Sequence, residues 1–205
     1  LNNTHQQLFS RCLNMNAQAQ FKKQSKKQPK KQSEALKKSN EEVATFGAGC
    51  FWHVEETFRT QRGVQKTSVG YMGGHFDHPC YLDVLSRITG HAEVAQIHYD
   101  PELISYEQLL TIFWRCHDPT TLNRQGPDRG EQYRSVIFYH TPKQAIAAQI
   151  SKAELNATGT YPNSIVTEIQ PAKDYWPATT DHQQYLLKKQ MQTLQRQNFS
   201  AVRTS

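Results

Sequence analysis

The sequence predicts an α+β fold, a two-layer sandwich with a mixed β-sheet, a ferredoxin-like core and long loops. From residue 41 onward, strand-like and helix-like segments follow one another in the order β-α-β-β-α-β-α-β. Two strand patterns occur in succession without a helix between them, which implies an antiparallel pair and excludes a purely parallel sheet. A polar stretch without a regular pattern separates Cys116 from Ser135, and its length is typical of a functional or flexible loop.

Five segments carry strand patterns. The first is a short apolar run that ends in glycines, and the third alternates regularly between two sets of side chains. The segments are VATFGAG (43–49), VQKTSVGY (64–71), EVAQIHYD (93–100), SVIFYH (135–140) and IVTEIQPA (165–172).

The helices are predicted from their start signals and apolar faces. The first runs from Cys50 to Arg59 and places three apolar side chains on one face, Phe51, Val54 and Phe58. Ser105 offers an N-cap for the second, with Gln108 three residues later as a capping box. The apolar face of the second helix consists of Leu109, Ile112, Phe113 and Cys116.

Two further helices follow. Thr141-Pro142 predicts a helix start with proline in the first turn. Its apolar stripe is expected to be Ile146, Ile150 and Ala153. Asp181 is expected to begin a last, polar helix.

Charge is distributed unevenly along the chain. Residues 1–40 contain nine Lys or Arg and one acidic residue, a balance of +8, whereas the other 165 residues contain 15 and 17, a balance of −2. The low-complexity Lys/Gln/Ser segment has too few apolar residues to offset the entropy of ordering it. We therefore expect a disordered tail at 1–40, a folded domain at 41–190 and a polar C-terminal tail at 191–205.

The basic tail leaves three interpretations open. A solvated arm is favoured over a contact with nucleic acid or an anionic membrane, because no interleaved aromatic residues accompany the charges. Its lack of acidic residues before Glu34 also leaves organellar targeting open. The four cysteines, Cys12, Cys50, Cys80 and Cys116, form no C-x-x-C pair, so reduced thiols and a cytoplasmic location are expected.

Cys50 is the first candidate for chemistry, because it follows a Gly-Ala-Gly turn and starts a predicted helix. There, unpaired backbone N–H groups and the helix dipole are expected to lower the pKa of the thiol. Gly47 and Gly49 would allow a sharp turn that leaves the sulfur accessible. On position alone, a small buried residue that ends the strand is an equally good interpretation.

Trp52 favours the functional interpretation of Cys50. Phe51 belongs to the apolar stripe and is explained by the core, but the helical neighbours of Trp52 are Glu55, Glu56 and Arg59. A tryptophan on a polar face beside a thiol is typical of a binding surface. The alternative is that the tail or a loop covers it.

Four more polar residues lie at predicted strand ends or in loops, where a rigid scaffold presents reactive groups. Tyr71 ends a strand before two glycines, Glu93 begins one, and Asp128 and Tyr133 lie in the long loop. Taken singly, each has a structural explanation: a loop anchor, a solvated edge or a turn.

Together these segments resemble the peptide methionine sulfoxide reductase A family. The similarity extends from Thr45 to Leu186 in five blocks of matching order and spacing: GAGCFWHVEE, VGYMGG, HAEV, FWRCHDPTTLNRQGPDRGEQYRSVIF and DHQQYL. The resemblance implies thiol-dependent reduction of methionine S-sulfoxide, free or in proteins, through a sulfenic acid on Cys50, and hence repair of oxidised proteins. It implies no metal and no cofactor.

The resemblance also implies roles for individual residues. Cys50 would attack the sulfoxide sulfur, and Glu93 would be the acid, with its pKa raised by an apolar pocket. Tyr71 and Tyr133 would donate hydrogen bonds to the sulfoxide oxygen, as in an oxyanion hole, and Asp128 would support the polar network. The substrate methyl group would be held by Phe51 and Trp52.

The chain departs from the family in its other cysteines. Many members have a resolving cysteine near the C-terminus, but no cysteine follows the DHQQYL block here. Others have one at the position of Leu85, and Cys80 stands where the family often has Thr or Ser. We favour Cys80 as the resolving thiol, with direct reduction by an external thiol as the alternative. Cys116 is expected in the core, and Cys12 in a tail that could reach the site.

The expected partners are oxidised proteins and peptides, free methionine sulfoxide, and thioredoxin or another thiol reductant. We expect a monomer that binds neither nucleic acid nor membranes. A metal-binding module of His75, His78, Cys80 and His91 is one rival, although the spacing is not a standard zinc arrangement. A cysteine hydrolase is another, and it would need a histidine such as His53 oriented on Cys50.

Overall fold

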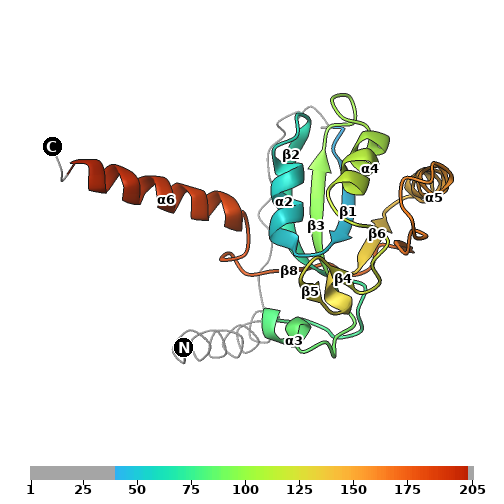
Figure 1. Ribbon diagram of the computed structural model, residues 1–205, viewed down its shortest axis with the longest axis horizontal. Coiled ribbons are helices and arrows are strands. Elements are labelled where there is room, and N and C mark those ends of the chain that lie inside the picture. The colour runs from blue at the N-terminus through green and yellow to red at the C-terminus, as the bar shows by residue number, and fades with distance from the viewer. Residues whose placement is uncertain (1–39, 203–205) are drawn as a thin grey trace, which may run out of the picture.

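The computed structural model describes residues 40–202, and side chains up to residue 197. The expectations for residues 1–39, including Cys12, lie outside this range. The described chain forms one six-stranded sheet in the order β7-β6-β1-β3-β2-β8 (Figure 1). The strands are β1 (Glu42–Ala48), β2 (Val64–Met72), β3 (Ala92–Tyr99), β6 (Ser135–Tyr139), β7 (Glu168–Pro171) and β8 (Trp176–Pro177).

The strand pairing confirms the predicted α+β class with a mixed sheet. Every neighbouring pair is antiparallel except β6 and β7, which are parallel and joined through the helix α5 (Pro142–Ala157). The successive strands β2 and β3 form the expected antiparallel pair, in a register that places Tyr71 opposite Glu93. Residues opposite one another on adjacent strands point to the same face of the sheet, so these two side chains share a face.

Helices α2 (Phe51–Arg59) and α4 (Tyr106–Arg115) pack against the sheet and against each other, and α5 packs beside α4. Their apolar side chains enclose one core with the sheet. Phe46 on β1 stacks against Phe58 at 5.3 Å and against Phe113 at 5.0 Å between ring centroids. Aromatic pairs at such distances stabilise a core beyond the area they bury, so the two helices are fixed relative to β1.

The start signals predicted for the first three helices are confirmed. Cys50 is the N-cap of α2, and Ser105 caps α4 with Gln108 completing the capping box. Thr141 caps α5, with Pro142 as its first residue. In the last two cases a side-chain oxygen accepts a hydrogen bond from an otherwise unpaired backbone N–H group.

The predicted apolar stripe of α5 is wrong. Ile146 and Ile150 are 58% and 53% exposed, and Ala153 is exposed, whereas Gln144 and Ala148 are buried. Gln144 faces inward because its amide bridges two backbone groups. Its Nε2 donates to the Val43 carbonyl at 2.7 Å, and its Oε1 accepts from the His140 N–H at 2.8 Å.

The last helix, α6, spans Tyr185–Val202, so the expected start at Asp181 is also wrong. Gln184 has a φ of +50°, a conformation that right-handed helices do not contain. Residues 181–184 therefore form turns. α6 extends away from the sheet (Figure 1) and continues through residue 190, where the sequence suggested a domain boundary. Within residues 40–202, no helix is long and apolar enough to cross a bilayer.

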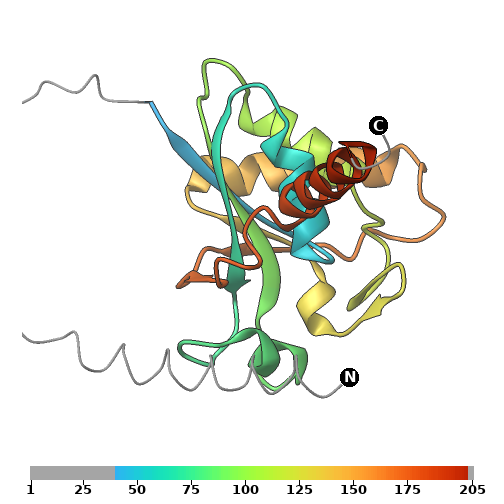
Figure 2. The same cartoon turned by 90° about the vertical axis from the view of Figure 1, so that its left-hand side faces the viewer.

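The long polar stretch before Ser135 is ordered into small elements. It contains a hairpin of β4 (Arg124–Gln125) and β5 (Asp128–Arg129), followed by a 3₁₀ turn, η1 (Glu131–Tyr133). A short helix between β2 and β3, α3 (Tyr81–Leu85), was not predicted. Figures 1 and 2 place α3 and the hairpin beyond the end of the sheet where β1 stops and α2 begins.

The inward position of Gln144 can be tested by Gln144→Leu, a change of similar size. It should lower the free energy of unfolding by about 1–3 kcal/mol, because two backbone groups lose their partner. The controls Ile146→Gln and Ile150→Gln alter exposed positions and should stay within about 0.5 kcal/mol of wild type. Urea unfolding measures all three. A larger loss of unfolding free energy in the isoleucine variants would instead support the apolar stripe predicted from the sequence.

Candidate active site

Cys50 lies in the turn between β1 and α2, as the sequence predicts. Gly49 in this turn has a φ of +90°, which side-chain-bearing residues rarely adopt. A Cβ atom at Gly49 would also lie 2.7 Å from the Cβ of Gln125 in the β4–β5 hairpin. The glycine therefore serves two purposes: it makes the turn, and it lets the hairpin lie directly against the chain beside Cys50.

The Cys50 thiol is partly buried, and its pKa is raised to about 11. Burial is the main cause, followed by the negative charge of Glu93, while the backbone N–H groups of Trp52 and His53 act in the opposite direction. The predicted lowering of this pKa is therefore wrong for the protein without substrate. The helix N-terminus does favour the thiolate, but burial and a neighbouring carboxylate outweigh it.

Glu93, the second residue of β3, is only 2% exposed. Its Oε2 accepts a hydrogen bond from the backbone N–H of Phe51, the first residue of α2, at 3.1 Å. Burial raises the pKa of the carboxyl to about 8, and this hydrogen bond offsets only part of the shift. The raised pKa confirms the sequence-based expectation, and Glu93 is mostly protonated at neutral pH.

Two tyrosines share the surroundings of Cys50 and Glu93. Burial and then the charge of Glu93 raise the pKa of Tyr133 on η1, and the same causes raise the pKa of Tyr81 to about 12. Cys50 and Asp128 also contribute to both shifts. Asp128 on β5 likewise acts on Cys50 and Glu93. The fold thus gathers the thiol, two carboxyl groups and two phenols from five separate segments.

Tyr81 is a residue that the sequence interpretation missed. It was read as part of a loop, but it is the first residue of α3, whose N-cap is Cys80. Asp83 accepts a hydrogen bond from the Cys80 N–H at 2.8 Å, which is half of a capping box. The spacing of Cys80 and Asp83 was the available signal for this short helix.

Tyr71 lies deeper than the other two tyrosines. It is opposite Glu93 on the neighbouring strand, is 1% exposed and contacts the ring of Phe51 at 5.8 Å between centroids. The structure therefore brings Tyr71 beside Glu93, and its role in hydrogen bonding to a substrate stays a prediction.

Phe51 and Trp52 differ in exposure. Phe51 is fully buried and belongs to the core, as one of the sequence interpretations held, whereas Trp52 is partly buried. The indole of Trp52 stacks on Tyr185 at 3.9 Å between centroids and donates from Nε1 to the Nδ1 of His182 at 3.2 Å. The segment that begins with His182 thus covers part of the polar face of α2. His182 and Tyr185 belong to the DHQQYL block, but the sequence interpretation gave them no role, because only the fold brings residues 182–185 to this helix.

No disulfide joins the cysteines within residues 40–202. Cys80 is partly buried and directly precedes Tyr81. Cys116 ends α4 and packs against the core, as predicted. Its Sγ donates to the Phe113 carbonyl at 3.2 Å, and burial raises its pKa to about 12.

The two rival sites are not formed. Within residues 40–202, no three His, Cys, Asp or Glu side chains gather as metal ligands would. Both ring nitrogens of His91 are engaged, one accepting from the Gly74 N–H at 3.0 Å and the other donating to the Phe76 carbonyl at 2.8 Å. His53 is exposed on α2, and no hydrogen bond joins its ring to Cys50.

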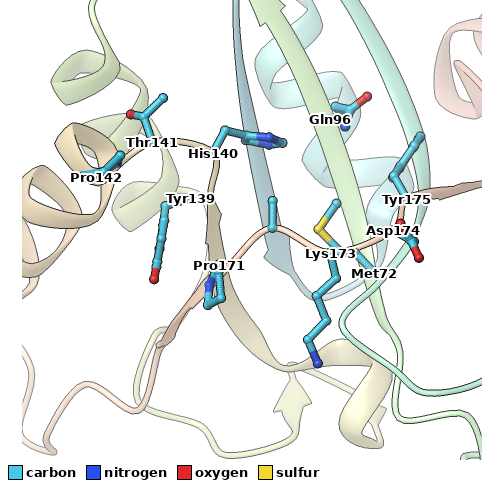
Figure 3. Close-up of a pocket in the computed structure, with 11 residues that line it drawn as sticks. Met72, Gln96, Tyr139, His140, Thr141, Pro142, Pro171, Lys173, Asp174 and Tyr175 are labelled. Atoms are coloured by element: carbon cyan, nitrogen blue, oxygen red, sulfur yellow. The ribbon is translucent and has the colours of Figure 1, made fainter.

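A cavity of about 520 Å³ lies on the face of the sheet opposite to the one that α2 covers (Figure 3). Its lining includes Met72 and Gln96, which alternate along their strands with the residues that face α2. None of the candidate site residues lines this cavity, so it is separate from the site around Cys50.

The chain is similar to known proteins over most of its described length. Residues 42–204 match the family described as peptide methionine sulfoxide reductase. The chain is 67% identical over 148 residues to peptide methionine sulfoxide reductase MsrA 1 of Nostoc sp.. The matched residues make up 72% of this chain and 91% of the relative.

Solved structures agree. Mxr1 of Saccharomyces cerevisiae in reduced form is 34% identical with a TM-score of 0.69, covering 74% of this chain and 87% of the other. Methionine sulfoxide reductase A of Corynebacterium diphtheriae is 34% identical with a TM-score of 0.66, covering 78% and 82%. A complex of Mxr1 with Trx2 also matches, at 25% identity and a TM-score of 0.51, covering 80% and 91%. Since the family match spans nearly all of the described residues and includes every candidate site residue, the chain belongs to the peptide methionine sulfoxide reductase family.

Proposed function

We propose that the protein reduces methionine S-sulfoxide, free or in proteins, to methionine and so repairs oxidised proteins. The main support for this proposal is that two reactive groups lie together at the N-terminus of α2. There a thiol, Cys50, lies beside a carboxyl group, Glu93, that keeps its proton near neutral pH. A sulfoxide needs both groups, because its sulfur becomes a good electrophile only when its oxygen is protonated or strongly hydrogen-bonded.

The first step of the proposed reaction needs no external reductant, because the Cys50 thiol supplies the two electrons. The Cys50 sulfur attacks the sulfoxide sulfur while Glu93 protonates the oxygen. The oxygen then passes to Cys50, which becomes a sulfenic acid as the substrate becomes a thioether. The thiol proton replaces the one that Glu93 has given. Methionine sulfoxide is reduced by two electrons to methionine, and Cys50 is oxidised by two.

Ionisation of Cys50 is tied to the proton on Glu93. The charge of Glu93 is one cause of the raised pKa of Cys50, and a protonated Glu93 does not exert it. A bound sulfoxide would add the partial positive charge of its sulfur beside the thiol, which favours the thiolate. We therefore propose that the thiolate forms in the substrate complex rather than in the free protein.

The phenols and aromatic rings complete the proposed site. Tyr81 and Tyr133 donate hydrogen bonds to the sulfoxide oxygen, supported by their common environment with Cys50 and Glu93. Asp128 sustains the polar network, and Trp52 with Phe51 holds the substrate methyl group. Tyr71 is kept as a third donor on the strength of its position opposite Glu93.

The sulfenic acid must then be returned to a thiol. We propose that Cys80 condenses with it to form a disulfide and water, because Cys80 directly precedes the site residue Tyr81. Thioredoxin would reduce this disulfide by thiol exchange. The structure of Mxr1 with Trx2 supports such a partner. Direct reduction by another thiol is the alternative, with Cys12 as a second internal candidate.

The finer organisation is part of the same proposal. The strand order β6-β1-β3-β2, with α2 and α4 as crossing helices, supports a ferredoxin-like core. We propose that residues 41–190 carry the activity, with tails at 1–40 and 191–205, and that the protein acts as a cytoplasmic monomer. The lack of a disulfide among Cys50, Cys80 and Cys116 supports a reducing compartment.

Cys50→Ser should abolish reduction of methionine sulfoxide, because a serine hydroxyl is neither ionised near neutral pH nor soft enough to attack sulfur. The assay measures methionine produced with dithiothreitol as reductant. The control is Cys12→Ser, which should keep its activity in this assay because dithiothreitol takes the place of any internal resolving thiol. Retained activity in Cys50→Ser would remove the central claim.

Glu93→Gln keeps the shape of the side chain but delivers no proton, so turnover should fall by roughly 10²- to 10⁴-fold. The same substitution should make the protein more stable relative to wild type as the pH rises. Glu93 has a raised pKa of about 8 in the folded state, so its contribution to stability is present below about pH 4.5 and is lost as pH rises through 8. Glu93→Gln has no carboxyl group to ionise and does not lose stability in this way. The difference between its melting temperature and that of wild type should therefore increase from pH 5 to pH 9.

The control for both effects is Glu131→Gln, on the neighbouring 3₁₀ turn η1. Its turnover and its pH dependence of melting should match wild type. Near-normal turnover of Glu93→Gln would mean that a tyrosine or water protonates the oxygen. A constant difference in melting temperature would mean that the carboxyl is ionised throughout this range.

Cys80→Ser should lose turnover driven by thioredoxin but keep one stoichiometric turnover, because the chemistry at Cys50 is unchanged. Wild type mixed with sulfoxide and no reductant should yield a Cys50–Cys80 disulfide in peptide maps. A Cys50–Cys12 linkage, or a persistent sulfenic acid reduced by glutathione, would refute the role of Cys80 and leave the reductase activity intact.

A further inference from the structure

The C-terminal segment His182–Tyr185 is held against α2 and β2 by its two glutamines. The Gln183 amide bonds to both the N–H and the carbonyl of Val69, each at 2.8 Å, and to the Ala178 carbonyl at 2.9 Å. The Gln184 N–H donates to Oε2 of the buried Glu55 at 2.6 Å. These bonds anchor the segment without any contribution from the side chain of His182.

The imidazole of His182 instead faces the candidate active site. It is 9% exposed, and its ring lies 5.6 Å from Phe51, 5.7 Å from Trp52 and 4.6 Å from Tyr81 between centroids. The plane of the imidazole is nearly parallel to that of Trp52, at 16°. One side chain therefore contacts both rings proposed to hold the substrate methyl group and a phenol proposed to bind the oxygen.

The hydrogen bond from Trp52 fixes the state of His182. Trp52 Nε1 only donates, so Nδ1 of His182 must accept with a lone pair. The ring is then neutral, with its proton on Nε2. Burial favours the neutral ring by lowering its pKa, and only the charge of Asp181 opposes this. Tyr81 and the aromatic residues of α2, Phe51 and Trp52, are the other groups that face the ring.

We propose that His182 is a positioning residue for the substrate-binding rings. Through Nδ1 it fixes the rotation of the Trp52 indole, and through its face it keeps Tyr81 and Phe51 at the spacing that a methyl sulfoxide requires. It does not take part in proton transfer. This inference rests on the proposed sulfoxide reductase activity. Its consequence is that His182 sets the affinity for methionine sulfoxide more than the rate of the chemical step.

Two substitutions separate the hydrogen bond from the bulk of the ring. His182→Phe keeps an aromatic ring of similar size but has no acceptor for Trp52 Nε1. His182→Asn places a carbonyl oxygen as far from its Cβ as Nδ1 is, and so restores the acceptor on a smaller side chain. The matched control is His140→Phe, because His140 bonds Thr45 Oγ1 at 2.8 Å through a ring nitrogen and is not among the candidate site residues.

Steady-state kinetics with methionine S-sulfoxide provide the first readout. His182→Phe should raise KM on the order of 10-fold with kcat within about 3-fold of wild type, as expected for the loss of one hydrogen bond that orients a binding group. His182→Asn should recover part of the lost affinity, and His140→Phe should leave KM unchanged. Wild-type KM in His182→Phe, or a fall in kcat alone, would overturn the proposal.

A second readout needs no activity. The indole N–H signal of Trp52, assigned in NMR spectra with Trp52→Phe, should exchange with solvent faster in His182→Phe than in wild type and return toward wild type in His182→Asn. Equal exchange in all three proteins would overturn the positioning role. If wild type reduces no sulfoxide, the proposed function fails by itself, while the exchange measurement still decides whether His182 holds Trp52.

Discussion

The N-terminus of α2 serves two acidic groups at once, and the rest of the site depends on this. Its first N–H group bonds Glu93, and the next two act on Cys50. A thiolate and a carboxylate side by side in a buried site repel each other, so the ionised forms of both groups are not populated together near neutral pH. In the protein without substrate both groups hold their protons near neutral pH. The proposed reaction uses this arrangement, since the proton on Glu93 goes to the oxygen while the charge forms on sulfur.

Two buried glutamates at α2, Glu55 and Glu93, differ in the hydrogen-bond donors that surround them and therefore in their roles. Glu55 is 1% exposed, and its two oxygens accept from the Thr67 hydroxyl and the Gln184 N–H. Burial still raises the pKa of Glu55, but both bonds favour the ionised form and offset part of that rise. Glu93 has one such donor, from Phe51, and its pKa rises to about 8. Glu55 therefore attaches the C-terminal segment to the domain, whereas Glu93 is suited to donate a proton.

Three segments far apart in sequence surround Cys50. The β4–β5 hairpin lies against Gly49, Tyr81 of α3 shares the electrostatic environment of the thiol, and His182–Tyr185 covers Trp52. The C-terminal segment contributes aromatic contacts and continues into α6.

Much of this protein follows from local sequence. The capping residues Ser105 and Thr141, the turn before Cys50 and the antiparallel pair β2–β3 were predicted because each depends on neighbouring residues alone. The family and the residues Cys50, Glu93, Asp128 and Tyr133 were indicated by short blocks of sequence in a fixed order.

Other features were decided by tertiary contacts. Gln144 displaced the isoleucines of α5 because the backbone groups of Val43 on β1 and of His140 offered it partners. Burial outweighed the helix N-terminus at Cys50. Tyr81 and His182 joined the site only when α3 and the end of the chain met α2. The sequence by itself determined which side chains could perform the chemistry. Burial and charge in the folded protein decided which of them hold protons and which rings lie beside Cys50, because both depend on groups brought together from distant positions.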